Sequence, residues 1–264
     1  MKIGFIGTGN MGAAILKGYL SAKPDYEKNI YAYDKDDEKV NSLAKDLGIH
    51  VCQDIKSLVE SCDIIILAVK PDILPSVVKQ LYPAMDEKKI LVSIAAGVSV
   101  EFIENLCKAK IVRAMPNTPA LLGHGMSALC RNDLVKDEEF NQVVDIFASI
   151  GLVEEVDQKL MDCVTGVSGS SPAYVYLFIE ALADAAVAEG MPRNQAYIFA
   201  AQAVKGAAEM VLKTGVHPGE LKDMVCSPGG TTIEAVQSLE KNGFRNAVIE
   251  AARKSANKSK DMTR

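Results

Sequence analysis

Short apolar runs alternate with amphipathic stretches over the first 158 residues, and this pattern predicts a parallel sheet covered by helices. The predicted strand at 63–69 is apolar from Ile64 to Val69, as expected for a strand buried on both faces. A helical pattern over 13–20 ends near Pro24, and another is predicted over 136–150. The predicted strands lie at 3–6, 30–33, 63–69, 90–94, 110–114, 126–130 and 152–156. We therefore expect an α/β domain of the doubly wound Rossmann type over residues 1–158.

Strand-like runs disappear after residue 158, and the remainder reads as helices separated by glycine and proline. The two helices predicted at 172–189 and 192–213 are rich in alanine and apolar on almost every face. Charged residues such as Glu180 and Asp184 interrupt them, which argues against membrane insertion. A helix that is apolar all round must be buried all round, and a small helical unit cannot surround two of them. We expect an all-α domain over 159–264 that forms a homodimer, with its alanines permitting close helix contact.

The first predicted strand runs directly into the glycine-rich segment 7–12, and a helix follows. The next strand ends at Asp34, 22 positions after Gly12. Strand, glycine turn, helix, strand and acidic residue together form the dinucleotide-binding fingerprint. The cofactor-binding residues predicted from the turn are Gly7, Thr8, Gly9, Asn10, Met11 and Gly12.

Small residues follow the next strands along the chain. The segments 68–71, 95–97 and 115–119 are rich in alanine, glycine and proline. The ends of parallel strands meet at one edge of a sheet, where ligands bind, and small residues there leave room for a flat ring. Tight packing is the alternative explanation for the alanines. Lys70 is the one lysine at a central strand end and is a candidate cofactor contact or general acid.

Composition and charge remove several other classes of function. The net charge of −5 and the pI near 5.4 argue against a nucleic-acid partner. The one basic cluster, at 253–264, complements the negative end of a C-terminal helix. The six cysteines are scattered without a C-x-x-C pair, and the three histidines are isolated, so we expect reduced thiols, a cytoplasmic protein and no metal site. The basic cluster at 253–264 consists of Arg253, Lys254, Lys258, Lys260 and Arg264.

A second candidate site lies in the segment 226–234, where Pro228 and two glycines precede Thr231 and Thr232. Thr231 and Glu234 have the spacing of a capping box, so a helix is predicted to begin at Thr231 or Thr232. The unpaired N–H groups at such a helix end attract a carboxylate or phosphate. An ordinary loop-to-helix turn is the alternative.

A dinucleotide domain followed by a helical dimer domain suggests a reductase or dehydrogenase. The chain offers few titratable groups for acid–base chemistry, and a protonated imine is the hydride acceptor that needs least help of that kind. An alcohol-forming β-hydroxy acid dehydrogenase needs a proton donor, for which Lys205 is the one interior candidate, and it lacks polar neighbours. An imine reductase of the same architecture and a non-catalytic dinucleotide sensor are further alternatives.

The whole chain resembles pyrroline-5-carboxylate reductases. The resemblance rests on the motifs at 7–12, 68–71, 95–97, 113–119, 167–174, 190–192, 217–223 and 227–232. It implies reduction of 1-pyrroline-5-carboxylate to L-proline, the last step of proline biosynthesis, with NADPH or NADH. It further implies a substrate loop at the dimer interface and assembly of dimers into larger rings.

The resemblance also implies roles for individual residues. The hydroxyl of Thr232 is expected to hydrogen-bond the ring nitrogen, as the catalytic contact. The substrate-binding residues are then Ser227, Gly229, Gly230, Thr231 and Thr232. The cofactor contacts beyond the glycine turn are Asp34, Lys35, Ala68, Val69, Lys70, Pro71, Ala95, Ala96 and Asn117.

The sequence leaves the choice between the two cofactors open. Asp34 is placed to bond a ribose 2′-hydroxyl and to repel a 2′-phosphate, whereas Lys35 beside it can pair with a phosphate. NADPH is favoured on the resemblance alone, and NADH is possible because of Asp34.

Overall fold

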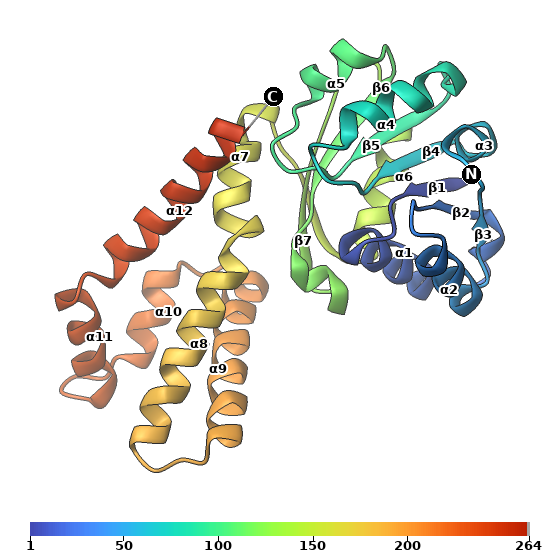
Figure 1. The fold of residues 1–264 in the computed structure, drawn as a ribbon. Coiled ribbons are helices and arrows are strands. Elements are labelled where there is room, and N and C mark those ends of the chain that lie inside the picture. Colours follow the sequence, from blue (N-terminus) through green and yellow to red (C-terminus); the bar gives the residue numbers. More distant parts are fainter. Residues whose placement is uncertain (263–264) are drawn as a thin grey trace. The chain divides into compact units, whose positions relative to one another are not determined.

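The computed structural model describes residues 1–262, so Arg264 of the basic cluster lies outside the described residues. The chain forms two compact units (Figure 1). The first comprises Met1–Ser170 together with the end of the chain from Lys254, and the second is Ser171–Arg253.

The first unit contains an eight-stranded sheet in the order β3-β2-β1-β4-β5-β6-β7-β8. The chain starts near the middle at β1, moves outward to β3 and then returns to the other side of β1 with β4, so β1 and β4 flank the switch point. The strands β1 to β6 are parallel, whereas β7 runs antiparallel to β6 and β8 parallel to β7. This arrangement confirms the predicted doubly wound sheet. The strands are β1 (Ile3–Ile6), β2 (Ile30–Tyr33), β3 (His50–Val51), β4 (Ile64–Leu67), β5 (Ile90–Ser93), β6 (Lys110–Met115), β7 (Gly125–Arg131) and β8 (Gly151–Glu155).

The sheet separates two apolar cores. Ile64 and Ile66 of β4 enter one core, and Ile65 and Leu67 enter the other, because successive side chains of a strand point to opposite faces. Residues of α1, α2 and α6 fill the first core, and residues of α3, α4 and α5 fill the second (Figure 1). The helices are α1 (Asn10–Ala22), α2 (Asp37–Leu47), α3 (Ile55–Ser61), α4 (Leu74–Leu81), α5 (Val100–Leu106) and α6 (Asp137–Ala148).

All seven strands predicted from the sequence are present, each with ends within two residues of the expected positions. The strand β3, which has two residues that are both exposed, was not predicted. Such a strand lacks the apolar run by which the others are recognised.

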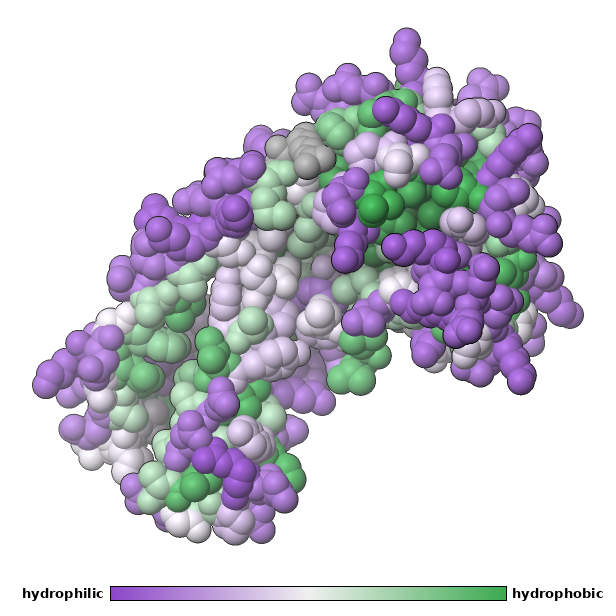
Figure 2. Space-filling view, in the orientation of Figure 1, coloured by the Kyte–Doolittle hydropathy of each residue, from purple (hydrophilic) through white to green (hydrophobic). Residues whose placement is uncertain are grey.

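The second unit is helical and has little core of its own. Among its apolar residues only Ala183, Ala196 and Ala200 are buried. Large side chains face outward instead, with Ile198 68% and Phe199 65% exposed, and apolar patches accordingly appear on the helices of this unit (Figure 2). The helices are α8 (Ser171–Ala188), α9 (Arg193–Thr214), α10 (Pro218–Val225), α11 (Thr231–Lys241) and the first part of α12 (Phe244–Met262).

The end of α12 belongs to the first unit. Ser259 donates a hydrogen bond from its hydroxyl to Asp162 Oδ1 at 2.6 Å, and the hydroxyls of Ser170 and Ser255 lie 2.8 Å apart. Asp162 lies in α7 (Met161–Val164), which continues into the π-helical turn Thr165–Gly169. These contacts attach the last turns of the chain to the segment that follows the sheet.

The pairing of β7 with β8 depends on a glycine contact. Gly151 has φ +147°, and a Cβ there would collide with the backbone of Gly125 across the ladder. We expect Gly151→Ala to lower the free energy of unfolding by about 3 kcal/mol, because backbone must move to admit the methyl group. Urea denaturation measures this loss.

Gly123→Ala is the matched control for this variant. Gly123 has φ +73°, but a Cβ there meets no described atom within 4 Å. The backbone penalty alone then costs about 1 kcal/mol. If the two variants lost equal amounts of unfolding free energy, the steric explanation for Gly151 would be contradicted.

Candidate functional site

The glycine turn after β1 is packed against the end of β4. Gly7 has φ +96°, and a Cβ there would collide with the carbonyl of Ala68. A Cβ at Gly12 would collide with the carbonyl of Gly7. Both glycines are therefore required by the protein's own backbone, which brings the start of α1 close to the switch point between β1 and β4.

Gly9 is different, because nothing in the described chain explains its missing side chain. It is the N-cap of α1 with φ −62°, a conformation open to any residue, and a Cβ there meets no described atom within 4 Å. Its helix end has no side-chain cap and no acidic residue in its first turn. Free space beside unpaired N–H groups is the cradle that a dinucleotide's diphosphate requires, so the residues present fit this cofactor.

Asp34 follows β2 and is hydrogen-bonded to the glycine turn. Its Oδ2 accepts from the backbone N of Thr8 at 2.6 Å and from the Thr8 hydroxyl at 2.9 Å. Its Oδ1 accepts from the backbone N of Asp36 at 3.2 Å. Burial alone would raise the pKa of Asp34, but these hydrogen bonds outweigh it and lower that pKa below its ordinary value. The carboxylate is thus ionised and fixed in orientation, while Lys35 beside it is exposed.

The other residues predicted for the turn divide into packing and exposed positions. Met11 is partly buried against the core of β1 and α1, so its side chain packs within the first unit. Asn10 is exposed at the first position of α1. Thr8 is almost fully buried, and both of its polar hydrogens are used by Asp34.

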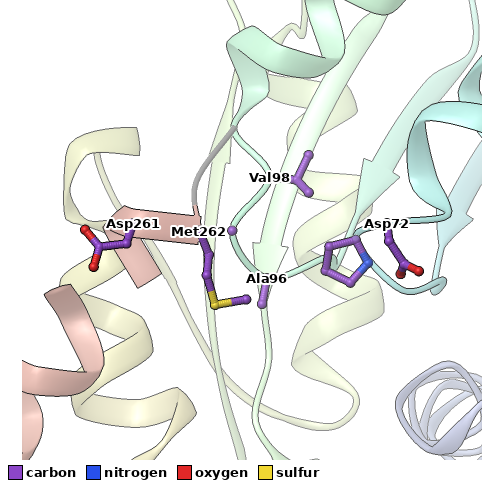
Figure 3. A pocket seen from close by; sticks show the side chains of 7 residues that line it. Asp72, Ala96, Val98, Asp261 and Met262 are labelled. Carbon is purple, nitrogen blue, oxygen red and sulfur yellow. The ribbon is translucent and has the colours of Figure 1, made fainter. Parts of the chain in front are cut away.

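The small residues after β4 and β5 adjoin a cavity of about 400 Å³ (Figure 3). Pro71 and Ala96, both predicted cofactor contacts, line it together with Gly97. Ala95 is buried, Ala68 and Val69 are half-buried, and Lys70 is exposed. The full lining is Pro71, Asp72, Ala96, Gly97, Val98, Asp261 and Met262.

Asp72 and Val98 were not predicted, and neither were Asp261 and Met262, which come from the far end of the chain. Asp261 and Met262 in the last turn of α12 form one wall of the cavity (Figure 3). Gly97 has φ +67°, and a Cβ there would lie 3.3 Å from the carbonyl oxygen of Met262. The glycine was the one available signal, and it does not identify which segment approaches it.

Asn117, the last predicted cofactor contact, is held by the protein on both sides of its amide. Its Nδ2 donates to the carbonyl of Ser168 at 3.0 Å, and its Oδ1 accepts from the backbone N of Met126 at 2.9 Å. One amide hydrogen and one oxygen lone pair remain for a ligand. The residue therefore joins the turn after β6 to the π-helical turn before α8.

The second candidate site is the loop between α10 and α11. The backbone N of Gly230 donates to the carbonyl of Ser227 at 3.0 Å, which closes a tight turn, and Gly229 has φ +66°. The helix α11 begins at Thr231, as predicted. Its N-terminus has no side-chain cap, and Thr232 is half-buried.

The capping box expected from Thr231 and Glu234 is not formed. Gly230 takes the N-cap position, so Thr231 is already the first helical residue and Glu234 lies one position too far along the helix. This correction strengthens the anion-binding interpretation, because the first N–H groups of α11 keep no side-chain acceptor.

The predicted residues therefore fall into two groups. The glycine turn, Asp34 and the small residues after β4 and β5 belong to the first unit, and the loop 227–232 belongs to the second. The first group offers a diphosphate cradle, a fixed carboxylate and room for a ring, and the second offers unpaired N–H groups beside two threonines.

Two family models match the chain. The one described as "Pyrroline-5-carboxylate reductase dimerisation" matches residues 158–262, and the one described as "NADP oxidoreductase coenzyme F420-dependent" matches residues 2–97. The pyrroline-5-carboxylate reductase of Escherichia coli is 50% identical over 268 residues, covering 100% of this chain and 98% of that protein.

Solved structures agree along the full length. Plasmodium falciparum pyrroline carboxylate reductase with NADP bound has a TM-score of 0.89 and 38% identity, covering 100% of this chain and 98% of that chain. A pyrroline-5-carboxylate reductase from Coxiella burnetii has a TM-score of 0.93 and 32% identity, with the same coverage.

Gly9→Ala tests the cradle. The Cβ is sterically free within the chain and the backbone angles are allowed, so we expect an unchanged melting temperature. The methyl group occupies the space beside the N-terminus of α1, so the dissociation constant for NADPH should rise by at least about tenfold. Calorimetric titration measures the binding.

Gly12→Ala is the control, because its Cβ collides with the Gly7 carbonyl. This variant should lose stability as well as binding. Unchanged NADPH affinity in folded Gly9→Ala would show that the diphosphate does not lie at this turn.

Proposed function

The chain belongs to the pyrroline-5-carboxylate reductase family, and from this premise we propose which of its residues carry out the reaction. The protein is an oxidoreductase that reduces 1-pyrroline-5-carboxylate to L-proline with NAD(P)H, the last step of proline biosynthesis. The substrate carries a carboxylate and an imine nitrogen, and each needs a partner in the site.

We propose that the loop 227–232 binds the substrate carboxylate. The observation that carries this assignment is the N-terminus of α11, which has no side-chain cap behind a glycine turn. The backbone N–H groups of Thr231 and Thr232 are then donors for the carboxylate, with the positive end of the helix dipole behind them. Ser227, Gly229 and Gly230 shape the turn that presents these donors.

The hydroxyl of Thr232 is the proposed catalytic contact. A dinucleotide held by the first unit would supply the hydride that forms a C–H bond at the imine carbon, while the C=N electron pair moves to nitrogen. The imine enters protonated, so the product is a secondary amine and the reaction needs no oxyanion partner. Thr232 orients the ring nitrogen through a hydrogen bond, and most of the acceleration comes from positioning.

We propose that the dinucleotide extends from the glycine turn to the ends of β4 and β5. Gly9 would leave room for its diphosphate, and Ala68, Ala95 and Asn117 would hold its nicotinamide. The free lone pair and the free hydrogen of the Asn117 amide suit a carboxamide group. The further contacts of the proposed site are Thr8, Asn10, Met11, Asp34, Lys35, Val69, Lys70, Pro71 and Ala96.

Oligomerisation follows from the dimerisation domain and from the exposed apolar side chains of the second unit. The stretch Gln158–Ala188 reaches the length and the mean hydropathy (1.2) of a membrane-crossing helix. It carries Asp162, Glu180 and Asp184, and it lies within the matched dimerisation region. We therefore propose that a second copy of the chain covers this surface.

We propose the homodimer as the basic assembly, with rings of dimers as a further level. We divide the chain into a dinucleotide domain over 1–158 and a dimerisation and substrate domain over 159–264, a division supported by the family model that begins at residue 158. All six cysteines are free thiols, which supports a cytoplasmic location.

Thr232→Ala tests the catalytic assignment. We expect kcat for 1-pyrroline-5-carboxylate to fall by at least about tenfold, because the ring nitrogen loses its hydrogen-bond partner. Thr232→Ser keeps the hydroxyl and should restore most of the rate. Turnover is followed as loss of the reduced nicotinamide absorbance.

Ser238→Ala on the same helix is the control, since Ser238 is exposed and its backbone rather than its hydroxyl bonds Asn242. Wild-type kinetics in folded Thr232→Ala would remove the assigned role. Absence of turnover in the wild type would refute the reaction itself.

Sedimentation tests the assembly. The wild type should sediment as a dimer or a multiple of it at micromolar concentration, and Phe199→Asp, which places a charge on a 65% exposed apolar position of α9, should weaken association. Lys35→Ser on the first unit should leave the sedimentation coefficient unchanged. A stable wild-type monomer would contradict the proposed assembly.

A further inference from the structure

Asp34 is held by the glycine turn in a way that leaves one part of its carboxylate available. Oδ2 is occupied by both polar hydrogens of Thr8, whereas Oδ1 accepts only the longer bond from the backbone N of Asp36. An ionised carboxylate offers about four acceptor sites, so Oδ1 retains room for one further donor. Thr8 is 1% exposed, so its two hydrogen bonds to the carboxylate are shielded from water.

The position of this oxygen decides which donor it meets. In a doubly wound sheet the acidic residue after the second strand lies beside the adenosine ribose when the diphosphate lies on the glycine turn. NADH presents a 2′-hydroxyl there, which can donate to Oδ1. NADPH presents a phosphate, which is mostly dianionic at neutral pH and brings negative charge against a fixed carboxylate.

The segment after Asp34 offers few positive charges that could offset the negative charge of a 2′-phosphate. Of the six residues from Asp34 to Lys39, four carry carboxylates, two carry ammonium groups and none is an arginine. The two lysines are exposed, so their charges are screened by water.

The N-terminus of α2, which would otherwise be the natural anion site in this segment, is already occupied. Asp36 Oδ1 accepts from the backbone N of Lys39 at 3.1 Å, and Asp37 and Glu38 fill the first turn. A phosphate would therefore meet carboxylates where it needs donors.

We propose that Asp34, fixed by Thr8, makes NADH the preferred reductant of this enzyme. The inference rests on the proposed function for the reaction, but it concerns the adenosine end of the dinucleotide and is tested by binding. Thr8 acts as the positioning residue, and Asp34 is the residue that contacts the ribose.

Calorimetric titration with NADH and with NADPH, at one fixed salt concentration, tests the preference. We expect the wild type to bind NADH more tightly by at least about tenfold. Asp34→Ser removes the charge and should lower the ratio of the NADPH dissociation constant to the NADH dissociation constant by at least about tenfold. Asp37→Asn removes one charge from the same segment without touching Asp34, and it should change the ratio by less than about twofold.

Three results would overturn the proposal. The first is a wild type that binds NADPH as tightly as NADH or more tightly, and the second is a ratio that Asp34→Ser leaves unchanged. The third is an effect of Asp37→Asn as large as that of Asp34→Ser, which would assign the preference to the general field of the segment. If Asp34→Ser binds neither nucleotide, the proposal is tested by the ratio of the NADPH and NADH dissociation constants in the wild type and in Asp37→Asn.

The kinetics separate this proposal from the proposed function. Turnover of 1-pyrroline-5-carboxylate with a higher kcat/KM for NADPH would refute the preference and leave the reaction intact. The expected binding ratio without turnover by either cofactor would refute the reaction and leave the preference intact.

Discussion

The contact between the glycine turn and the end of β4 is the constraint on which the nucleotide site depends. Gly7 and Gly12 admit no side chain, because the backbone of Ala68 and of Gly7 itself fills the space. This packing holds the N-terminus of α1 at the switch point and brings Thr8 within reach of Asp34. A diphosphate cradle, a fixed carboxylate and the adjoining small residues thus follow from one close approach of backbone to backbone.

The fold could be predicted to a large extent because its signals are local. Apolar runs such as 64–69 identify central strands, and Gly7 to Gly12 with Asp34 identify the first βαβ unit. The pair His50–Val51 gave no signal because an exposed edge strand of two residues needs no apolar run. The capping box failed for a local reason as well, since Gly230 serves as N-cap in place of Thr231.

The features that escaped prediction depend on contacts between distant parts of the chain. Met262 lies beside Gly97 and lines the cavity at the end of β5, although 165 residues separate the two in sequence. The hydrogen bonds of Asn117 to Ser168 and Met126 are similar, because no local pattern shows which backbone groups its amide meets. Sequence reasoning named Asn117 as a candidate, but it did not supply these partners.

The second unit contains both the matched dimerisation region and the proposed substrate loop. Its helices expose apolar side chains over the region that matches the dimerisation model, and the same unit carries the loop proposed to bind substrate. A crystal structure of the enzyme with L-proline and oxidised dinucleotide tests the central claim most directly. The account predicts the proline carboxylate on the backbone N–H groups of Thr231 and Thr232, with the ring nitrogen at the Thr232 hydroxyl. Proline bound away from the N-terminus of α11 would contradict it.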